Sequence, residues 1–413
     1  MIPTVNFMVQ QLSINSKGMK VFNMTTEKGR AAVWIGSRKI KMMELPIPKA
    51  EENGAVIKIN ATAICGSDGN LFPMTPPYPA LLGHEITGTI VELGQRANNT
   101  LNVFGGPLKV GDRVVLYPWI TCGKCSSCLT FGPGKCTICE NSFFYGAPSE
   151  LFGIVRPDGL NDDVNTYPHF KGGFGEYLYI FPETYLWKLP DDMPSEVAAL
   201  LDPMAVAVRA VELACMCPGV VENSFTTNST IAVIGDGPIG ALCALVSRIM
   251  GVEKIVIIGG RNKRLSIATK LSQADYQINY KETALEERIK LVKDFTNGNG
   301  ADVVFQCSNQ PEAFVQGLEM MRRMGTLVEV GNVIDKDNDI SINVARHIAG
   351  KHARILGMAV NTSEAFDKAF HLLMRHKKID FMSMYTHISS LDTLENTLNS
   401  MNNEDYFKGL LKL

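Results

Sequence analysis

The chain has 413 residues, of which 46% are hydrophobic, and its formal net charge at pH 7 is −2. A chain this long exceeds one ordinary hydrophobic core, so we expect two domains, and the near-neutral charge argues against nucleic-acid and membrane-surface partners. No apolar run reaches the ~18 residues of a membrane-spanning helix, and residues 1–20 lack the basic and apolar segments of a secretory signal, which predicts a cytoplasmic protein.

The N-terminal part of the chain is predicted to contain short strands. Residues 1–29 are polar and irregular, and we expect an extension with little structure of its own. Half-buried strands are predicted at 31–35, 40–45 and 55–63 from the pattern of apolar and polar residues.

Candidate metal ligands follow the third of these strands. Cys65 and Ser67 lie in Cys-Gly-Ser-Asp, and His84 and Glu85 are neighbours before an apolar strand at 86–93. A thiolate and an imidazole are good zinc ligands, and the carboxylate could be a third ligand or support one. Neighbours on a regular strand face opposite ways, so both His84 and Glu85 can bind only if the backbone turns there. The alternative is a buried thiol and a hydrogen-bonded histidine without a metal.

Four cysteines in a short, glycine-containing lobe indicate a second metal site. They are Cys122, Cys125, Cys128 and Cys136. Four thiols match tetrahedral zinc coordination with no open position, so this zinc would be structural. Cys139 is a spare thiol nearby and is not expected to be a ligand. The alternative is a disulfide pair. It is less favoured, because the cysteines are clustered and the chain shows no secretory signal.

The middle of the chain gives weaker signals. Residues 141–171 are long, aromatic and loop-like, and such a loop is either functional or disordered. A strand is predicted at 177–181, and a helix begins near Pro194. That helix carries Asp202, an acid in an otherwise apolar stretch, which makes it a candidate site residue. The alternative is that Asp202 caps the helix or lies in a loop.

A glycine turn between a strand and a helix indicates a dinucleotide-binding site. An apolar strand at 231–234 enters Gly-Asp-Gly-Pro-Ile-Gly, and a second apolar strand follows at 254–258. The three glycines permit a tight turn, close approach to a pyrophosphate and close packing of the helix, whose free N–H groups would bind the pyrophosphate. An ordinary glycine-rich turn is the alternative. The residues expected to contact the cofactor here are Gly235, Gly237, Pro238, Ile239 and Gly240.

The end of the second strand bears on the choice of cofactor. An NAD site usually has a carboxylate about 20 residues past the glycines, on the ribose hydroxyls. Here the strand ends in Gly259-Gly260-Arg261, with no acid at its tip. Arg261 is suited to a 2′-phosphate, so the sequence favours NADP over NAD, unless the basic residues are only a solvated helix start. Further cofactor-binding candidates are Arg264, Tyr280 and Cys307.

These motifs, in this order, resemble those of the zinc-containing medium-chain dehydrogenases, and especially their polyol (sorbitol), threonine and glucose dehydrogenase branch. The resemblance covers about residues 30–413. It implies an α/β fold with two domains. A mostly-β, GroES-like catalytic domain would comprise 30–193 and 348–413, with a structural zinc lobe at 119–140. A Rossmann coenzyme domain with a doubly wound parallel sheet would comprise 194–347.

The resemblance also implies residue roles. Cys65, His84 and Glu85 would bind a catalytic zinc ion, Asp202 would bind that zinc or its water, and Ser67 would relay a proton from the substrate oxygen. The four cysteines of the lobe would hold a structural zinc, giving two zinc ions per chain. The expected function is NAD(P)-dependent oxidation of a secondary alcohol, polyol or sugar, or the reverse reduction, by a homodimer or homotetramer.

Three features depart from the family pattern. Asn70 replaces the histidine that many polyol-type members use as the next step of the proton relay, and Asp202 replaces the more common glutamate. The 141–171 loop and the N-terminal extension are longer than usual. Two other functions stay open: a zinc-independent reductase of conjugated carbonyls on the same scaffold, and a non-enzymatic zinc-binding module.

Overall fold

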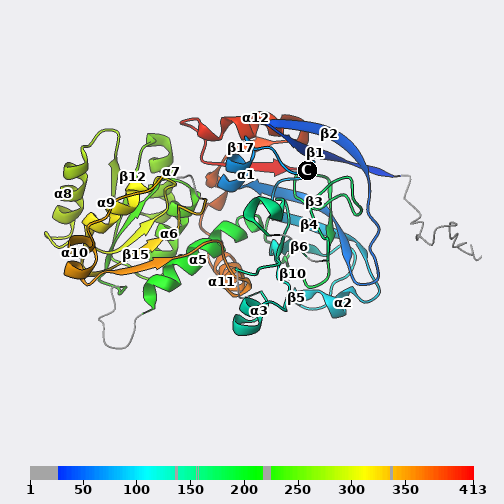
Figure 1. Cartoon of the computed structure of the whole chain (residues 1–413), viewed down its shortest axis with the longest axis horizontal. Helices are drawn as coiled ribbons and strands as arrows, with labels where there is room; N and C mark the ends of the chain where they lie inside the picture. The colour runs from blue at the N-terminus through cyan, green and yellow to red at the C-terminus, as the bar shows by residue number, and fades with distance from the viewer. Residues whose placement is uncertain (1–26, 135–137, 155, 157, 217–224, 335–337) are drawn as a thin grey trace, which may run out of the picture.

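The computed structural model of the chain describes residues 27–134, 138–154, 156, 158–216, 225–334 and 338–413. One domain is built on a mixed β-sheet and the other on a parallel β-sheet, and the long helix α5 (Leu201–Cys215) lies between them (Figure 1). Within the described residues, no helix is both long enough and apolar enough to cross a membrane.

The mixed sheet brings the candidate metal ligands together. Its strands are β3 (Ala55–Ile64), β4 (Glu85–Leu93), β5 (Asn102–Phe104), β6 (Arg113–Leu116), β9 (Tyr177–Ile180), β10 (Tyr185–Lys188), β17 (Tyr385–Ser389) and β18 (Lys408–Lys412). Their order is β17-β18-β3-β4-β6-β10-β5, with β9 also paired to β3. β3 and β4 are antiparallel, and Ala63 lies opposite Glu85, so the end of β3 meets the start of β4.

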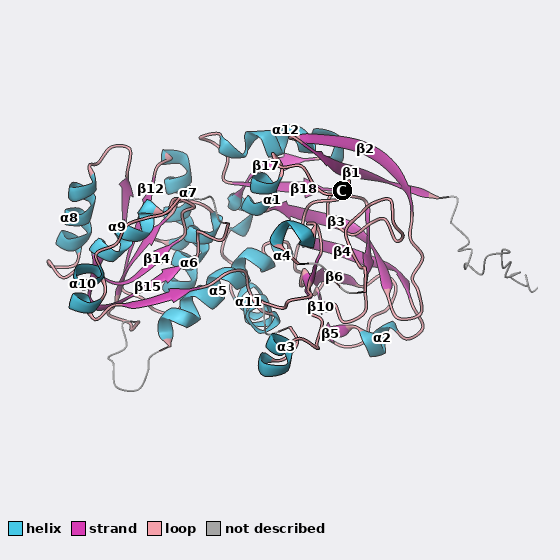
Figure 2. Cartoon of the chain, in the orientation of Figure 1, coloured by secondary structure: helices cyan, strands magenta, loops and turns pink. Residues whose placement is uncertain are grey.

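Shorter elements surround this sheet. An antiparallel pair, β1 (Lys28–Gly36) and β2 (Lys39–Pro46), is separate from it (Figure 2). The other short elements of this domain are α1 (Gly66–Leu71), α2 (Ala97–Thr100), β7 (Trp119–Ile120), α3 (Ser126–Phe131), β8 (Phe143–Phe144), α4 (Ser195–Ala198), α11 (Ser363–Arg375), α12 (Leu394–Asn399) and the 3-10 turns at Ser149–Phe152, Phe381–Met384, Leu391–Thr393 and Ser400–Asn402.

The second domain has a six-stranded sheet in which every pairing is parallel. Its strands are β11 (Thr230–Ile234), β12 (Lys254–Gly259), β13 (Tyr276–Asn279), β14 (Ala301–Gln306), β15 (Met321–Glu329) and β16 (Arg354–Gly357), in the order β13-β12-β11-β14-β15-β16. Counted within this domain the order is 3-2-1-4-5-6, that of the dinucleotide-binding Rossmann fold. Its helices are α6 (Pro238–Ile249), α7 (Asn262–Ser272), α8 (Leu285–Phe295), α9 (Glu312–Met320) and α10 (Val344–His347), with a 3-10 turn at Ala349–Lys351.

A shared hydrophobic core joins the two domains. Buried side chains of α5, among them Met204 and Val211, belong to the same cluster as Leu242 of α6 and Phe366 of α11. Every residue of β11 is buried, because helices cover both faces of a parallel sheet. The α/β class, the strands at 31–35, 40–45, 55–63, 231–234 and 254–258, and the Rossmann topology are confirmed.

Two predicted boundaries need correction. β16 still pairs with β15, so the parallel sheet extends past the boundary expected between 347 and 348. The sequence could not place this boundary, because β16 has only four residues and its pattern does not indicate which sheet it joins. β1 begins at Lys28, inside the expected extension, whose residues 1–26 lie outside the described part of the chain.

The described residues of the 141–171 segment pack as part of the mixed-sheet domain. Tyr145, Phe170 and Lys171 are buried, and the Tyr145 hydroxyl accepts a hydrogen bond from the Phe181 backbone N–H at 2.9 Å. The segment is therefore a folded part of the domain along these contacts, rather than a disordered insertion.

Candidate active site

A buried carboxylate holds the two chain segments that carry the candidate zinc ligands. Asp68 of α1 is fully buried; its Oδ2 accepts the Cys65 N–H at 2.8 Å, and its Oδ1 accepts the Gly83 N–H at 3.2 Å. The same Oδ1 lies 3.7 Å from His84 Nδ1. One side chain thus fixes the segment after β3 relative to the segment before β4. Asp68 lies in the Cys-Gly-Ser-Asp motif, and the motif alone does not indicate this role.

The structure brings Cys65, His84 and Glu85 together. One ligand atom from each lies within 4.8 Å of the other two. His84 precedes β4, which starts at Glu85, so strand alternation does not separate the two side chains. Gly83 makes the turn: its φ is +87°, and a Cβ there would lie 2.5 Å from the Phe174 ring.

The donor set fits a zinc ion. A thiolate, an imidazole and a carboxylate are ordinary zinc ligands, and three protein ligands are typical of a zinc site that keeps an open position. His84 Nδ1 is buried and has no hydrogen-bond partner among the described residues. Burial lowers the pKa of His84, but the negative charges of Cys65 and Asp68 outweigh it and raise that pKa to about 10. The same negative charges would attract a metal cation.

A buried lysine neutralises part of this charge. Lys408 of β18 lies 3.0 Å from Glu85 Oε1, to which it donates a hydrogen bond, and 2.8 Å from Oε2 in an ion pair that lacks hydrogen-bond geometry. Lys408 Nζ also donates to the Ile64 carbonyl at 3.2 Å. Burial lowers the pKa of Lys408, whereas the charges of Glu85 and Cys65 raise it, and the net change is upward. Lys408 was not among the predicted site residues, and its one signal in the sequence is that a lysine stands at the start of an apolar strand.

Asp202 lies beside this group and outside it. Its Oδ1 accepts a hydrogen bond from Asn361 Nδ2 at 2.9 Å, and it does not join the three clustered ligand atoms. Desolvation raises the pKa of Asp202 to about 6, with Glu85 adding to the rise and His84 opposing it. Asp202 therefore shares the electrostatic environment of the site.

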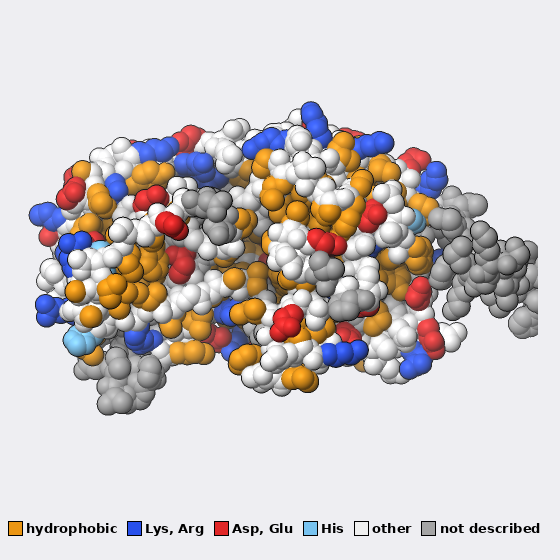
Figure 3. Space-filling view, viewed as in Figure 1, with side chains coloured by type: hydrophobic (Ala, Val, Ile, Leu, Met, Phe, Trp, Pro, Cys, Tyr) orange, Lys and Arg blue, Asp and Glu red, His pale blue; other side chains and the backbone are white. Residues whose placement is uncertain are grey.

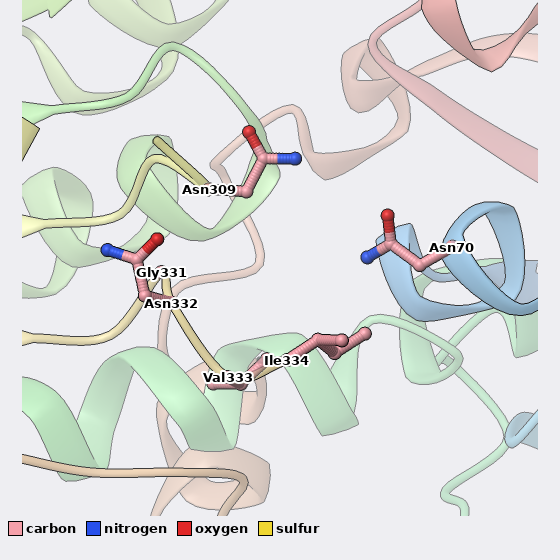
Figure 4. Close-up of a pocket in the computed structure, with 6 residues that line it drawn as sticks. All are labelled: Asn70, Asn309, Gly331, Asn332, Val333 and Ile334. Carbon is pink, nitrogen blue, oxygen red and sulfur yellow. The ribbon is translucent and has the colours of Figure 1, made fainter. Parts of the chain in front are cut away.

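The remaining predicted residues of this domain lie on α1. Ser67 is part-exposed two residues after Cys65, and Asn70 is exposed at the gap between the domains. Figure 4 shows Asn70 across this gap from Asn309 and Asn332 of the parallel-sheet domain. The pocket between them is lined by Asn70, Asn309, Gly331, Asn332, Val333 and Ile334. Asn70, one of the two residues that depart from the family pattern, thus faces the parallel-sheet domain.

The cysteine lobe forms a second group of candidate ligands. The sulfur atoms of Cys122, Cys125, Cys128 and Cys139 all lie within 4.8 Å of one another. The Cys125 N–H donates to Cys122 Sγ at 3.3 Å, as expected beside a thiolate, and the described cysteines are free rather than disulfide-bonded. Cys139, expected to be a spare thiol that is not a ligand, thus has its sulfur within the group, and the choice of the fourth ligand stays a prediction. Cys136, predicted for that place, lies outside the described residues.

The glycine turn after β11 has the shape of a phosphate cradle. Gly235 has φ +131°, and a Cβ on Gly240 would lie 2.0 Å from the Gly235 carbonyl oxygen, so both positions need glycine. A Cβ on Gly237 would meet nothing within 4 Å, so open space lies before the N-terminus of α6, which begins at Pro238 and Ile239. This opening fits a pyrophosphate.

The other predicted cofactor residues fall into two sets. Gly259 and Gly260 lie at the tip of β12, with the Tyr280 ring against Gly260, and the Cys307 backbone lies against Gly235. The two arginines instead reach the other domain. Arg261 donates to the Asn402 carbonyl at 3.2 Å, and Arg264 donates to the carbonyls of Met401 and Tyr406.

Comparison with known proteins agrees with this geometry. The family of zinc-binding dehydrogenases matches residues 238–375, and the alcohol dehydrogenase GroES-like domain matches residues 51–191. The chain is 30% identical to sorbitol dehydrogenase of Bacillus subtilis over 76% of its own length and 78% of the relative's. It is also 30% identical to a probable D-xylulose reductase A of Arthroderma otae over 74% and 76%, respectively. A crystal structure of an alcohol dehydrogenase from Thermotoga maritima superposes with a TM-score of 0.80 at 26% identity, covering 94% of this chain and 99% of that one.

Proposed function

The chain belongs to the zinc-binding alcohol dehydrogenase family, and from this we propose that it transfers a hydride between a nicotinamide coenzyme and a secondary alcohol or polyol, or the matching ketone. The observation that carries the proposal is the cluster of Cys65, His84 and Glu85 at the junction of the two domains. Relatives named sorbitol dehydrogenase and D-xylulose reductase support a polyol or its ketose as substrate.

The residues of the mixed-sheet domain would perform the following steps. Cys65, His84 and Glu85 would hold a zinc ion, which supplies Lewis-acid polarisation of the substrate oxygen. Ser67 would take the hydroxyl proton of an alcohol substrate and pass it toward solvent. Asn70 can orient a substrate hydroxyl with its amide, but it cannot accept a proton as a histidine can.

The parallel-sheet domain would place the nicotinamide. Gly237 and the N-terminus of α6 would hold the pyrophosphate. A coenzyme anchored there would extend its nicotinamide end toward the gap between the domains. A nicotinamide coenzyme held there would supply hydride transfer to or from the substrate carbon. Preference for NADP, argued from Arg261, stays a prediction, as do the homo-oligomeric state and the cytoplasmic location.

We infer a second, structural zinc in the cysteine lobe. Cys122, Cys125 and Cys128 are common to the sequence prediction and the structural cluster, whereas Cys136 and Cys139 compete for the fourth position. Four sulfur ligands leave no site for substrate, so this zinc would stabilise the lobe.

The direct test combines zinc analysis with a panel of polyols and both coenzymes. We expect two zinc ions per chain and polyol-dependent formation of reduced coenzyme. Cys65→Ser should lose one zinc ion and its turnover while keeping coenzyme binding, and Cys215→Ser, a part-buried thiol outside both clusters, serves as the matched control. One zinc ion per chain together with reduction of conjugated carbonyls would favour the zinc-independent reductase instead.

A further inference from the structure

The side chain between the first two glycines of the turn points toward the tip of β12. Asp236 Oδ2 accepts the Gly260 N–H at 2.8 Å and the Arg261 N–H at 2.9 Å. These two amides follow β12 directly, at the place where NAD-binding folds carry an acidic side chain. Although the strand has no acid of its own, a carboxylate therefore lies at its tip.

Asp236 fills the room that the glycines of the tip leave open. A Cβ built on Gly259 would lie 2.3 Å from the Asp236 Cβ and 2.4 Å from its Oδ2. On Gly260, a Cβ would lie 2.3 Å from the Tyr280 ring. Glycine at 259 is thus explained by the carboxylate that reaches across from the turn, rather than by space kept for a 2′-phosphate.

One oxygen of this carboxylate is left for a ligand. Oδ2 is engaged by two backbone amides, whereas no described group hydrogen-bonds Oδ1, and the Asp236 side chain is only part-buried. A carboxylate oxygen only accepts hydrogen bonds, which suits ribose hydroxyls, and its negative charge repels a 2′-phosphate.

The two neighbouring arginines form hydrogen bonds with the other domain. Arg261 and Arg264 donate to backbone carbonyls of residues 401–406 in the other domain. Arg264 remains close enough to Asp236 for that carboxylate to act on it electrostatically. Lys263 is exposed on α7. The positive charge that favoured NADP in the sequence thus helps to hold the two domains together.

We propose that Asp236 binds the adenosine ribose hydroxyls and makes NAD the preferred coenzyme, in contrast to the preference expected from Arg261. This inference rests on the proposed dehydrogenase function, because it assigns a residue within the coenzyme site of that function. Asp236 also has a structural role, because its Oδ2 accepts the two backbone hydrogen bonds at the tip of β12. This role leaves Oδ1 free to bind the ribose.

The test is equilibrium binding of NADH and NADPH to the zinc-loaded protein, followed by coenzyme fluorescence. A hydrogen bond to a charged group corresponds to about tenfold or more in affinity, so the unaltered protein should bind NADH at least about tenfold more tightly than NADPH. Asp236→Asn should weaken NADH binding by about tenfold and remove most of the difference. Asp294→Asn removes the same charge from the last turn of α8, next to Phe295, which contacts Tyr276 and Lys254 at the starts of β13 and β12 rather than the tip of β12, and it should change neither affinity.

Each outcome is decisive. Tighter binding of NADPH by the unaltered protein, or an unchanged ratio of the two affinities in a folded Asp236→Asn variant, would overturn the role of Asp236 and leave the dehydrogenase proposal intact. If Asp236→Asn does not fold, Asp236→Ser is measured in its place, and the comparison of coenzymes in the unaltered protein still decides. Binding of neither coenzyme would instead refute the proposed function itself.

Discussion

Lys408 and Glu85 form the most deeply buried ion pair near the candidate zinc site, with side-chain exposures of 3% and 0%. Two charges at this depth lose their hydration, and their mutual contact, the hydrogen bond to Ile64 and the negative charges of Cys65 and Asp68 compensate. A zinc ion would give Glu85 a second cationic partner. The lysine therefore limits the negative charge of the ligand set while the metal is absent.

Removal of Lys408 should destabilise the metal-free protein more than the zinc-bound protein. Lys408→Met leaves a buried carboxylate without its partner, which we expect to lower the free energy of unfolding by about 3–5 kcal/mol in chelator-treated protein. With zinc bound the loss should be smaller. Lys408→Arg, which keeps the charge, is the matched control, and urea unfolding with and without zinc is the measurement. Equal losses in both states would show that Glu85 does not face the metal.

At the scale of elements, the connection into β4 places the ligands. Gly83 combines a left-handed backbone with contact to Phe174, and Asp68 of α1 binds the amide of the same glycine. A side chain at Gly83 would force the Phe174 ring or the start of β4 to move, because its Cβ would lie 2.5 Å from that ring. The placement of His84 relative to Cys65 thus depends on two residues that bind no metal, Gly83 and Asp68.

Gly83→Ala should cost more than the same change in an open turn. Gly159 has a similar φ, +75° against +87°, but a Cβ there would meet nothing within 4 Å. We expect Gly159→Ala to cost about 1–2 kcal/mol from backbone strain, and Gly83→Ala about 1–3 kcal/mol more from overpacking. Thermal unfolding of both variants measures the difference, and equal melting temperatures would contradict the tight contact with Phe174.

The lobe that contains α3 should depend on its metal. Cys125→Ser should remove one zinc ion per chain and lower the melting temperature, because a structural zinc contributes folding energy. Zinc analysis of Cys136→Ser and Cys139→Ser then identifies the fourth ligand. Unchanged zinc content and melting temperature in Cys125→Ser would show that the four sulfur atoms hold no ion.

Local patterns predicted much of the fold and part of the site. The glycine turn after β11 and the Cys65, His84 and Glu85 positions each carry their signal in a few neighbouring residues. Lys408 could not be predicted because its partner Glu85 is 323 residues away in the sequence. The role of Asp236 depends on which way its side chain points, and spacing alone does not specify that direction.

At the scale of the whole molecule, the two domains share one core beside the candidate site. α5 carries Asp202 at the metal end and packs against α6 of the coenzyme domain, so it connects both halves of the site. On the face shown in Figure 3, basic and acidic side chains are interspersed without a large region of one sign.

The measurement that bears most directly on the proposed chemistry is anomalous X-ray diffraction at the zinc absorption edge, on crystals of the protein grown with NADH. We predict two peaks per chain, one bonded to Cys65, His84 and Glu85 and one inside the cysteine lobe. A single peak, in the lobe alone, would contradict a zinc-dependent reaction at the junction of the two domains.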